Sequence, residues 1–467
     1  MTKRILCAVL TIVACAGPVA AQDTLSPDLR SSIDKAAAEV LEATGAPSAS
    51  VAVVRDGAIA YVHAYGLATI EPPTPATTEM RYSIGSISKQ FTAAAILLLA
   101  EDRKLSLDDK VAKWLPDLTR ANEVTIRQLL SMTSGYQDFW PQDYVMPPMM
   151  LPTTAQQIMN GWAKIPLDFA PGTKWQYSNT NYVIAGAIVE RVSGMPLIEL
   201  LQRRVFTRLG MKSVVNTDDA ALGPADPMRY LRYAIGPPRH APKEGKGWMF
   251  AAGELAMTAR DLGLWDISTI DQTILKPASY QTMQTNMLLK NGIATGYGLG
   301  VQVGMSAGRR VVSHTGEVSG FTAANQIYPD DKAAVVVLTN LDATGASSQL
   351  AGRIATVLFR AASPDNAAAA ALAQAKTIFE GLQHGRIDRA LFTSNANAYF
   401  TDGALADFAS GLGPLGPPQE FEQASQSLRG GMVSRSFRIK CGAKTLRLTT
   451  FIMPDGKLEQ YQIAATE

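Results

Sequence analysis

Cysteine is scarce in this chain. There are three in 467 residues, and two of them, Cys7 and Cys15, lie in an apolar stretch close to the N-terminus. Removal of that stretch during export would leave Cys441 alone. A disulfide within the chain and a cysteine-based metal site are then both excluded.

The N-terminal residues have the pattern of a secretory signal peptide. Lys3 and Arg4 precede an apolar run that is shorter than the roughly 20 residues of a membrane-spanning helix, and small residues follow up to Ala21. We expect residues 1–21 to be a cleaved signal peptide and the mature protein to be secreted, to the periplasm or outside the cell. The residues before Cys15 also resemble a lipoprotein cleavage box, so anchoring through a lipid on that cysteine stays open as an alternative.

Neither sign of charge is in excess. Lysine and arginine number 43 against 41 aspartates and glutamates, and removal of Lys3 and Arg4 brings the bases to 41. A formally neutral protein gives no reason to expect nucleic acid or an anionic membrane surface as a partner. Histidine is rare too, and His63, His240 and His384 have no metal-ligand spacing. We therefore predict no metal site and no cofactor.

Several well-known motifs are missing. The sequence has no His-Glu-x-x-His helix and no phosphate-binding loop, and its one Gly-x-Ser-x-Gly match, residues 304–308, falls between two predicted strands and not at the strand-to-helix elbow of an α/β-hydrolase. These observations argue against an α/β-hydrolase, a zinc protease and a nucleotide-binding protein. The composition, with 47% hydrophobic and 18% charged residues, is typical of a globular protein. At this length we expect a large catalytic domain and a smaller second domain.

The pattern of apolar residues predicts an α+β fold. Strands at both ends of the large domain, with helices between them, indicate one antiparallel sheet flanked by helices, plus a mainly helical subdomain. The predicted strands are a hairpin over residues 50–65 and the segments 297–303, 310–314, 321–328 and 333–340. The predicted helices cover residues 90–101, 125–132, 182–193 and 197–209. The long connection over residues 223–247 is rich in proline and glycine and is a candidate for the rim of an active site.

A domain boundary is predicted near residue 364. The composition changes there to an alanine-rich stretch around Ser363 and Pro364, and the pattern of elements begins anew. We assign residues 22–364 to the large domain and residues 365–467 to a small α+β domain. The small domain is predicted to contain two or three short helices and then strands over residues 432–440, 445–453 and 457–463.

Ser86 and Lys89 are three positions apart, just before the apolar helix predicted over residues 90–101. Residues with this spacing face the same side of a helix, so the lysine can take the proton that the serine loses when it attacks a carbonyl. The start of a buried helix also offers N–H groups that favour developing negative charge. A second pair with this spacing, Ser32 and Lys35, falls on a polar helix, and we interpret it as surface.

Two other short motifs contain polar groups. Tyr177 and Asn179 form the one Tyr-x-Asn of the chain, just before a predicted helix. Alone, they fit a helix cap at least as well as a catalytic role. His314, Thr315 and Gly316 end a predicted strand. Alone, they fit an ordinary strand end, although a strand beside an active site offers backbone N–H groups to a substrate and glycine lets the substrate lie close.

Taken in order, the three motifs resemble the signature of the class C β-lactamase and DD-peptidase family of penicillin-recognising serine hydrolases. That family also contains esterases and D-amino-acid peptidases. Similar stretches extend the resemblance over roughly residues 30–360; they are residues 129–135, 171–181, 251–261 and 296–300. The resemblance implies a β-lactamase/transpeptidase-like fold and a serine hydrolase that forms an acyl-enzyme.

The resemblance also implies a role for each residue of the first two motifs. Ser86 would be the nucleophile and Lys89 the acceptor of its proton. Tyr177 would exchange protons with both and with the leaving group. Asn179 would hydrogen-bond Lys89 and the amide of the substrate.

On the strand, the resemblance implies contacts with the substrate. The backbone N–H groups of Ser86 and Glu317 would form the oxyanion hole, with Gly316 beside them, while Thr315 and His314 contact the substrate. His314 stands where the β-lactamases of the family have a lysine. Because histidine is mostly neutral at pH 7, this departure favours a peptidase or an esterase over a β-lactamase.

We therefore expect a D-amino-acid peptidase, DD-carboxypeptidase or esterase that works through an acyl-enzyme at Ser86. Its substrate would be a small molecule or a peptide, such as a peptidoglycan stem peptide or a β-lactam. A true class C-like β-lactamase and a slowly deacylating penicillin-binding or cell-wall sensor protein stay open as alternatives, since the latter differs only in the rate of deacylation. Arg309 and Arg310 could bind an acidic substrate, but we interpret them as a solvated strand edge. The small C-terminal domain resembles accessory domains of the nuclear-transport-factor type, and we assign it no catalytic role.

Overall fold

The structure is a computed structural model that describes residues 24–142, 144–360 and 366–466. The predicted signal peptide and the predicted boundary at residue 364 lie outside the described residues. The chain divides into two compact units, the first ending at Val357 and the second beginning at Leu358. Within the described part of the chain, no helix has the length and apolar character needed to cross a membrane.

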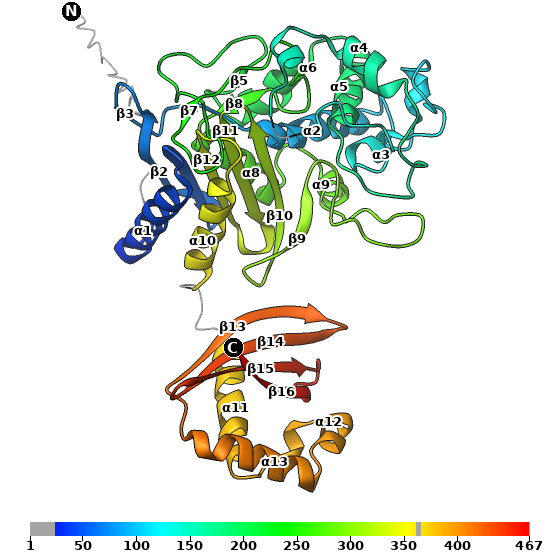
Figure 1. Ribbon diagram of the computed structural model, residues 1–467. Coiled ribbons are helices and arrows are strands. Elements are labelled where there is room, and N and C mark those ends of the chain that lie inside the picture. Colours follow the sequence, from blue (N-terminus) through cyan, green and yellow to red (C-terminus); the bar gives the residue numbers. More distant parts are fainter. Residues whose placement is uncertain (1–23, 143, 361–365, 467) are drawn as a thin grey trace, which may run out of the picture. The chain divides into compact units, whose positions relative to one another are not determined.

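In the described part of the first unit, a seven-stranded sheet forms the centre, and all its neighbouring strands are antiparallel. The order is β3-β2-β1-β12-β11-β10-β9, so the first and last strands of the unit pair in the middle of the sheet, with Val51 opposite Val337 (Figure 1). The strands are β1 (Ser48–Arg55), β2 (Ala58–Thr69), β3 (Thr74–Pro75), β9 (Gln302–Ser306), β10 (Arg309–Val318), β11 (Phe321–Tyr328) and β12 (Ala333–Thr339). The predicted antiparallel sheet, closed by the two ends of the domain, is confirmed.

Most predicted strands of this sheet form. The hairpin over residues 50–65 is β1 and β2, and residues 321–328 and 333–340 become β11 and β12. β10 is longer than the predicted residues 310–314, because it continues to Val318. This extension places Thr315, Gly316 and the two residues after them on a regular strand.

The strand predicted over residues 297–303 is wrong in its first half, since β9 begins only at Gln302. The residues before it bond to the helical part instead of to β10. Leu299 donates its N–H to the carbonyl of Met283, and Gly300 donates to that of Leu130. These bonds attach the segment before β9 to the helices. Residues 314–318 of β10 therefore have no neighbouring strand on the β9 side.

The predicted helices form, and they pack against one another as the helical part of the first unit (Figure 1). They are α2 (Ser88–Glu101), α3 (Ile126–Leu130), α5 (Asn179–Ser193), and α6 (Leu197–Leu201), which continues through a π-helical turn (Gln202–Phe206) into α7 (Thr207–Leu209). The other helices of this unit are α1 (Pro27–Thr44), α4 (Ala155–Ile158), α8 (Ala259–Asp271), α9 (Pro277–Met283) and α10 (Ala346–Arg360). Short strand pairs complete it: β4 (Tyr82–Ser83) and β5 (Val215–Asn216) on β8 (Leu255–Met257), and β6 (Tyr230–Leu231) with β7 (Arg239–His240).

Helix α2 lies between the sheet and the other helices and is buried almost all round. Its Phe91 is fully buried, with ring centroids 4.6 Å from Trp265 and 5.5 Å from Phe206. Polar bonds add to this packing: the side chain of Gln90 accepts from Trp265 and donates to Asn325 on β11. α2 is therefore attached both to α8 and to the sheet.

In the described part of the second unit, helices pack on one four-stranded antiparallel sheet with the order β13-β14-β15-β16 (Figure 1). Its elements are α11 (Asn366–Gln383), α12 (Ser394–Tyr399), α13 (Asp402–Leu412), β13 (Glu420–Arg429), β14 (Met432–Cys441), β15 (Lys444–Ile452) and β16 (Leu458–Thr466). The α+β class and the last three strands agree with the sequence prediction. The sequence analysis did not predict β13, because this edge strand buries Phe421 but is polar and largely exposed over residues 422–427.

Loss of the Phe91 ring should loosen the helix that presents Ser86. We expect Phe91→Ala to lower the free energy of unfolding by about 3–5 kcal/mol, because it empties a fully buried aromatic site. Urea unfolding followed by tryptophan fluorescence measures this in the first unit, since all six tryptophans lie there. Tyr233→Ala, at a side chain that is 72% exposed, should change stability by less than about 0.5 kcal/mol. A Phe91→Ala protein as stable as this control would contradict the packing role.

Candidate active site

Ser86 lies in a single 3₁₀ turn (Gly85–Ile87) that leads directly into α2. This turn places Lys89 on the first turn of the helix, with its Nζ 2.8 Å from the Oγ of Ser86. The pair predicted from the spacing is therefore in hydrogen-bond contact. The other pair with this spacing is not comparable, because Ser32 and Lys35 are exposed on α1.

Lys89 is fully buried. Its Nζ donates to three oxygens, each at 2.8 Å, which belong to Ser86, the side chain of Asn179 and the carbonyl of Ala252. Burial lowers the pKa of Lys89 to about 7, and the negative charge of Asp138 acts in the opposite direction. A lysine of ordinary pKa is a cation at pH 7, whereas this amine exists there in both forms and can accept a proton from Ser86.

Asn179 is the first residue of α5, so the helix begins at the predicted motif rather than after it. Ser178 occupies the cap position but makes no side-chain cap bond, and its hydroxyl donates to the carbonyl of Gln137. The carboxylate of Asp138 accepts the backbone N–H of Asn179 at 2.9 Å and its side-chain NH₂ at 3.3 Å. The interpretation of this motif as its own helix cap is therefore wrong, because an acid from another loop caps the helix.

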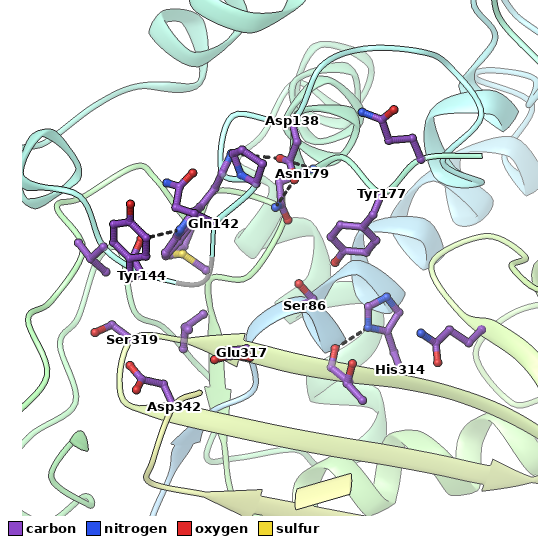
Figure 2. Close-up of a pocket in the computed structure, with 18 of the residues that line it drawn as sticks. Ser86, Asp138, Gln142, Tyr144, Tyr177, Asn179, His314, Glu317, Ser319 and Asp342 are labelled. Atoms are coloured by element: carbon purple, nitrogen blue, oxygen red, sulfur yellow. Dashed lines mark hydrogen bonds between the residues drawn. The ribbon is translucent and has the colours of Figure 1, made fainter. Parts of the chain in front are cut away.

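Tyr177 lies across the site from β10, with Ser86, Tyr177 and His314 facing one another (Figure 2). The centre of the Tyr177 ring is 5.0 Å from the Nζ of Lys89 and 6.2 Å from the centre of the His314 ring. Burial raises the pKa of the Tyr177 phenol, while Ser86 acts to lower it. The phenol is thus protonated at neutral pH, which suits a group that passes a proton on to a leaving group.

The surroundings of His314 favour a neutral imidazole ring. Its Nδ1 lies 2.6 Å from the carbonyl oxygen of Thr315, which can only accept, so this nitrogen carries the hydrogen. Its Nε2, 2.8 Å from the hydroxyl of Tyr297, then accepts. Burial and the nearby charge of Lys89 lower the pKa of His314 to about 4. The side chain therefore cannot act as the cation that a lysine would provide there.

Two glycines let β10 lie directly on the turn that contains Ser86. A Cβ added to Gly316 would be 1.8 Å from the carbonyl oxygen of Ile84, and one added to Gly85, which has φ +51°, would be 2.7 Å from the nitrogen of Glu317. The pairing of β10 with β9 ends before this point. The backbones of residues 85–86 and 316–317 consequently lie side by side, as an oxyanion hole made from Ser86 and Glu317 requires.

A cavity of about 630 Å³ opens above Ser86. Two of the predicted residues do not line it, because Lys89 is buried beneath Ser86 and Gly316 is a buried residue of β10. The other predicted residues do, namely Ser86, Tyr177, Asn179, His314, Thr315 and Glu317. Among the lining residues that the sequence analysis missed are Asp138, Trp140, Tyr144, Trp175 and Asp342, labelled in part in Figure 2. Two sequence signals pointed toward them: Trp175 lies inside the stretch 171–181, and Asp138 and Trp140 closely follow the stretch 129–135.

The predicted rim over residues 223–247 is wrong, because none of those residues is among the described residues that line the cavity. The loop around residues 138–145 takes that place. Arg309 and Arg310 also lie elsewhere: they form ion pairs with Asp331 and Asp330 at the far end of β10. The other histidines, His63, His240 and His384, are exposed, and among the described residues no cluster suits a metal ion.

A sequence model of the family described as Beta-lactamase matches residues 33–358. The D-aminopeptidase of Brucella anthropi is 27% identical over 322 residues, which are 67% of this chain and 59% of that protein. Penicillin-binding protein 4* of Bacillus subtilis is 28% identical over 311 residues, 62% of this chain and 67% of that protein. This chain thus spans about three fifths of the length of the D-aminopeptidase.

Among solved structures, a D-stereospecific amidohydrolase from Streptomyces sp. matches with a TM-score of 0.60 and 26% identity. The match covers 68% of this chain and 96% of that protein. It confirms the predicted β-lactamase/transpeptidase-like fold of the large domain.

The contact between Gly316 and Ile84 predicts the effect of one methyl group. Gly316→Ala should reduce the rate at which a neutral fluorophosphonate labels Ser86 by roughly 100-fold, because the strand must move away from the turn and an oxyanion donor is lost. Gly304→Ala on β9 is the matched control, since a Cβ there meets nothing within 4 Å. Equal labelling rates for the two variants would contradict this geometry.

The lowered pKa of Lys89 predicts the pH dependence of that labelling. Only the unprotonated amine accepts the proton of Ser86, so the rate should rise with pH through a midpoint near 7 and level off above it. Below the midpoint it should fall about tenfold for each pH unit. Rates measured from pH 5 to pH 10 test this. A midpoint near the ordinary lysine value of 10.5 would show that burial does not lower the pKa of Lys89.

Proposed function

Because this chain belongs to the beta-lactamase family, we propose that it is a serine hydrolase that forms an acyl-enzyme at Ser86 with D-amino-acid amides, peptides or esters. The observation on which the proposal depends is the contact of Ser86 with a buried lysine of pKa about 7. A serine becomes a nucleophile at neutral pH when such a base lies within hydrogen-bond reach.

The reaction follows from the positions of these groups. The Oγ of Ser86 attacks the carbonyl carbon while its proton passes to the Nζ of Lys89. The backbone N–H groups of Ser86 and Glu317 stabilise the oxyanion. Tyr177 delivers a proton to the leaving amine or alcohol and regains one from Lys89, and the acyl group stays on Ser86. Water then attacks the ester, its proton passes through the same groups to the Oγ of Ser86 as the ester bond breaks, and the free acid leaves.

The charges of the cavity favour a substrate without a carboxylate near Ser86. The charged residues that line it are Asp138, Glu317 and Asp342, all acidic, and His314 is neutral. A DD-carboxypeptidase or a β-lactamase would have to place a substrate carboxylate among these acids, at a cost in Coulomb energy. A substrate with a free amino group fits better, in keeping with the names of the D-aminopeptidase and the D-stereospecific amidohydrolase that resemble this chain.

We further propose that the protein acts outside the cytoplasm. The support is the export pattern of residues 1–21. Peptides that contain D-amino acids, such as peptidoglycan fragments, would be available to it there.

The test compares serines in the two Ser-x-x-Lys pairs. Wild-type protein and Ser32→Ala should react with a fluorophosphonate and hydrolyse D-alanine and D-phenylalanine p-nitroanilides faster than the L-forms, N-acetyl derivatives or a chromogenic cephalosporin. Ser86→Ala should lose labelling and at least about 10³-fold of turnover.

Three outcomes would change the proposal. Turnover by Ser86→Ala would refute the assignment of the nucleophile. Faster hydrolysis of the cephalosporin would favour a β-lactamase. Stable labelling by a fluorescent penicillin without turnover would favour a penicillin-binding sensor.

A further inference from the structure

Asp138 is a half-buried acid in the wall of the cavity, on the loop between α3 and α4. Its carboxylate accepts three hydrogen bonds, from the backbone N–H of Trp140 at 3.2 Å and from the backbone and side chain of Asn179. Burial raises the pKa of Asp138 above its ordinary value, and these bonds together with the charge of Lys89 act in the opposite direction. Because every partner is a donor, the bonds favour the ionised form.

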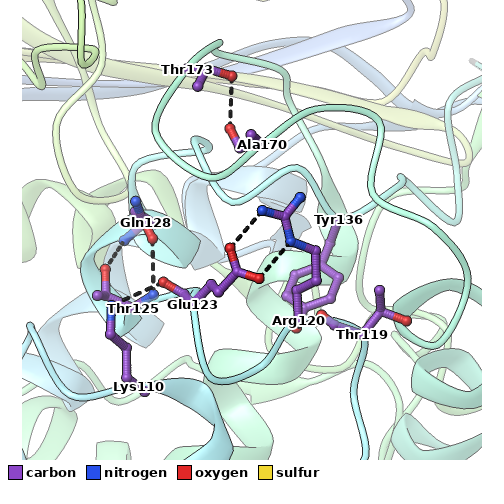
Figure 3. Close-up of polar contacts among 9 residues, drawn as sticks. All are labelled: Lys110, Thr119, Arg120, Glu123, Thr125, Gln128, Tyr136, Ala170 and Thr173. Carbon is purple, nitrogen blue, oxygen red and sulfur yellow. Dashed lines mark hydrogen bonds and ion pairs between the residues drawn. The ribbon is translucent and has the colours of Figure 1, made fainter.

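The loop that presents Asp138 is anchored on the side away from the cavity. The buried Tyr136 donates its hydroxyl to the carbonyl of Thr119 at 3.0 Å, beside the Arg120–Glu123 ion pair (Figure 3). Helix α3 before it begins with a capping box between Thr125 and Gln128, also seen in Figure 3. These contacts hold the segments that precede Asp138 in the chain.

We propose that Asp138 is a positioning residue for the proton acceptor of the reaction. Its carboxylate fixes the side-chain amide of Asn179 so that the oxygen, and not the NH₂ group, faces Lys89, and its charge keeps that amine basic enough to accept a proton. This inference rests on the proposed function. Since both oxygens of Asp138 are bonded to Asn179 or Trp140, its role is to hold Asn179 rather than to bind the substrate.

The orientation of Asn179 follows from what its neighbours can do. Asp138 can only accept, so the NH₂ group of Asn179 must point to it and the Oδ1 must point the other way. The Oδ1 then lies 2.8 Å from the Nζ of Lys89. Without an acceptor at position 138 the amide could turn and present NH₂ to the amine, a donor against a donor.

Of the groups around Lys89, Asp138 is the acid whose charge raises the pKa of the amine. Tyr177 and Tyr182, whose ring centres are 5.0 Å and 5.6 Å from the Nζ, are phenols whose pKa is raised by burial. His314 is neutral. Burial alone would leave Lys89 a weaker base, and the ionised Asp138 restores part of its affinity for a proton. A base whose pKa lies near the working pH is the most effective.

The experiment measures the rate of Ser86 labelling by a neutral fluorophosphonate against pH for wild-type protein, Asp138→Asn and Asp138→Ser. Asparagine and serine both keep an acceptor for the start of α5 but remove the charge. Both variants should lower the midpoint of the pH curve by roughly one pH unit and lower the plateau rate about tenfold. Tryptophan fluorescence during urea unfolding establishes that each variant is folded.

Asp168→Asn is the matched control, since this exposed acid of the neighbouring loop bonds Gln176, another residue of the cavity wall, and not Asn179. Its midpoint should equal that of the wild type. A reduced plateau with an unchanged midpoint in a folded Asp138→Asn or Asp138→Ser protein would show that Asp138 is merely structural and would overturn the inference. If wild-type protein is not labelled at Ser86 at all, the proposed function fails and this inference fails with it.

Discussion

The burial of one amine is the constraint on which the rest of the site depends. Lys89 is fully enclosed and makes three hydrogen bonds of 2.8 Å. A lysine in water keeps its proton far above pH 7 and could not accept one from a serine. Enclosure removes the water that stabilises the cation, and the ionised Asp138 limits how far the pKa falls. Ser86 is a nucleophile only because both effects act on its neighbour.

The architecture keeps that amine enclosed. α2 is tied to α8 through Trp265 and to the sheet through Asn325, so the helix that presents Ser86 and Lys89 is fixed from two sides. β10 closes the site from the third side, and it can do so because Gly316 has no side chain where it crosses the turn at Ile84. The sheet, the helices and the loops thus each contribute one wall to a single small volume.

Sequence patterns predicted the elements and motifs whose signal is local. The apolar faces of α2, β11 and β12 follow from periodicity, and the spacing of Ser86 and Lys89 places both on one side of a helix. The choice of Ser86 over Ser32 came from the apolar helix directly after it and from the ordered partners Tyr177 and His314. The order of the three motifs then indicated the family. Apart from that order, each of these signals is read within a few residues of the chain.

The remaining features depend on contacts between distant segments, and the sequence could not show them. Asp138 caps a helix that begins about 40 residues later, and residues 297–301 leave the sheet because they bond to Met283 and Leu130. The account is tested most directly by NMR titration of the Lys89 side chain in protein labelled at lysine Cε, assigned with Lys89→Arg. It predicts a resonance that titrates near pH 7, and a resonance that titrates above pH 10 would contradict it.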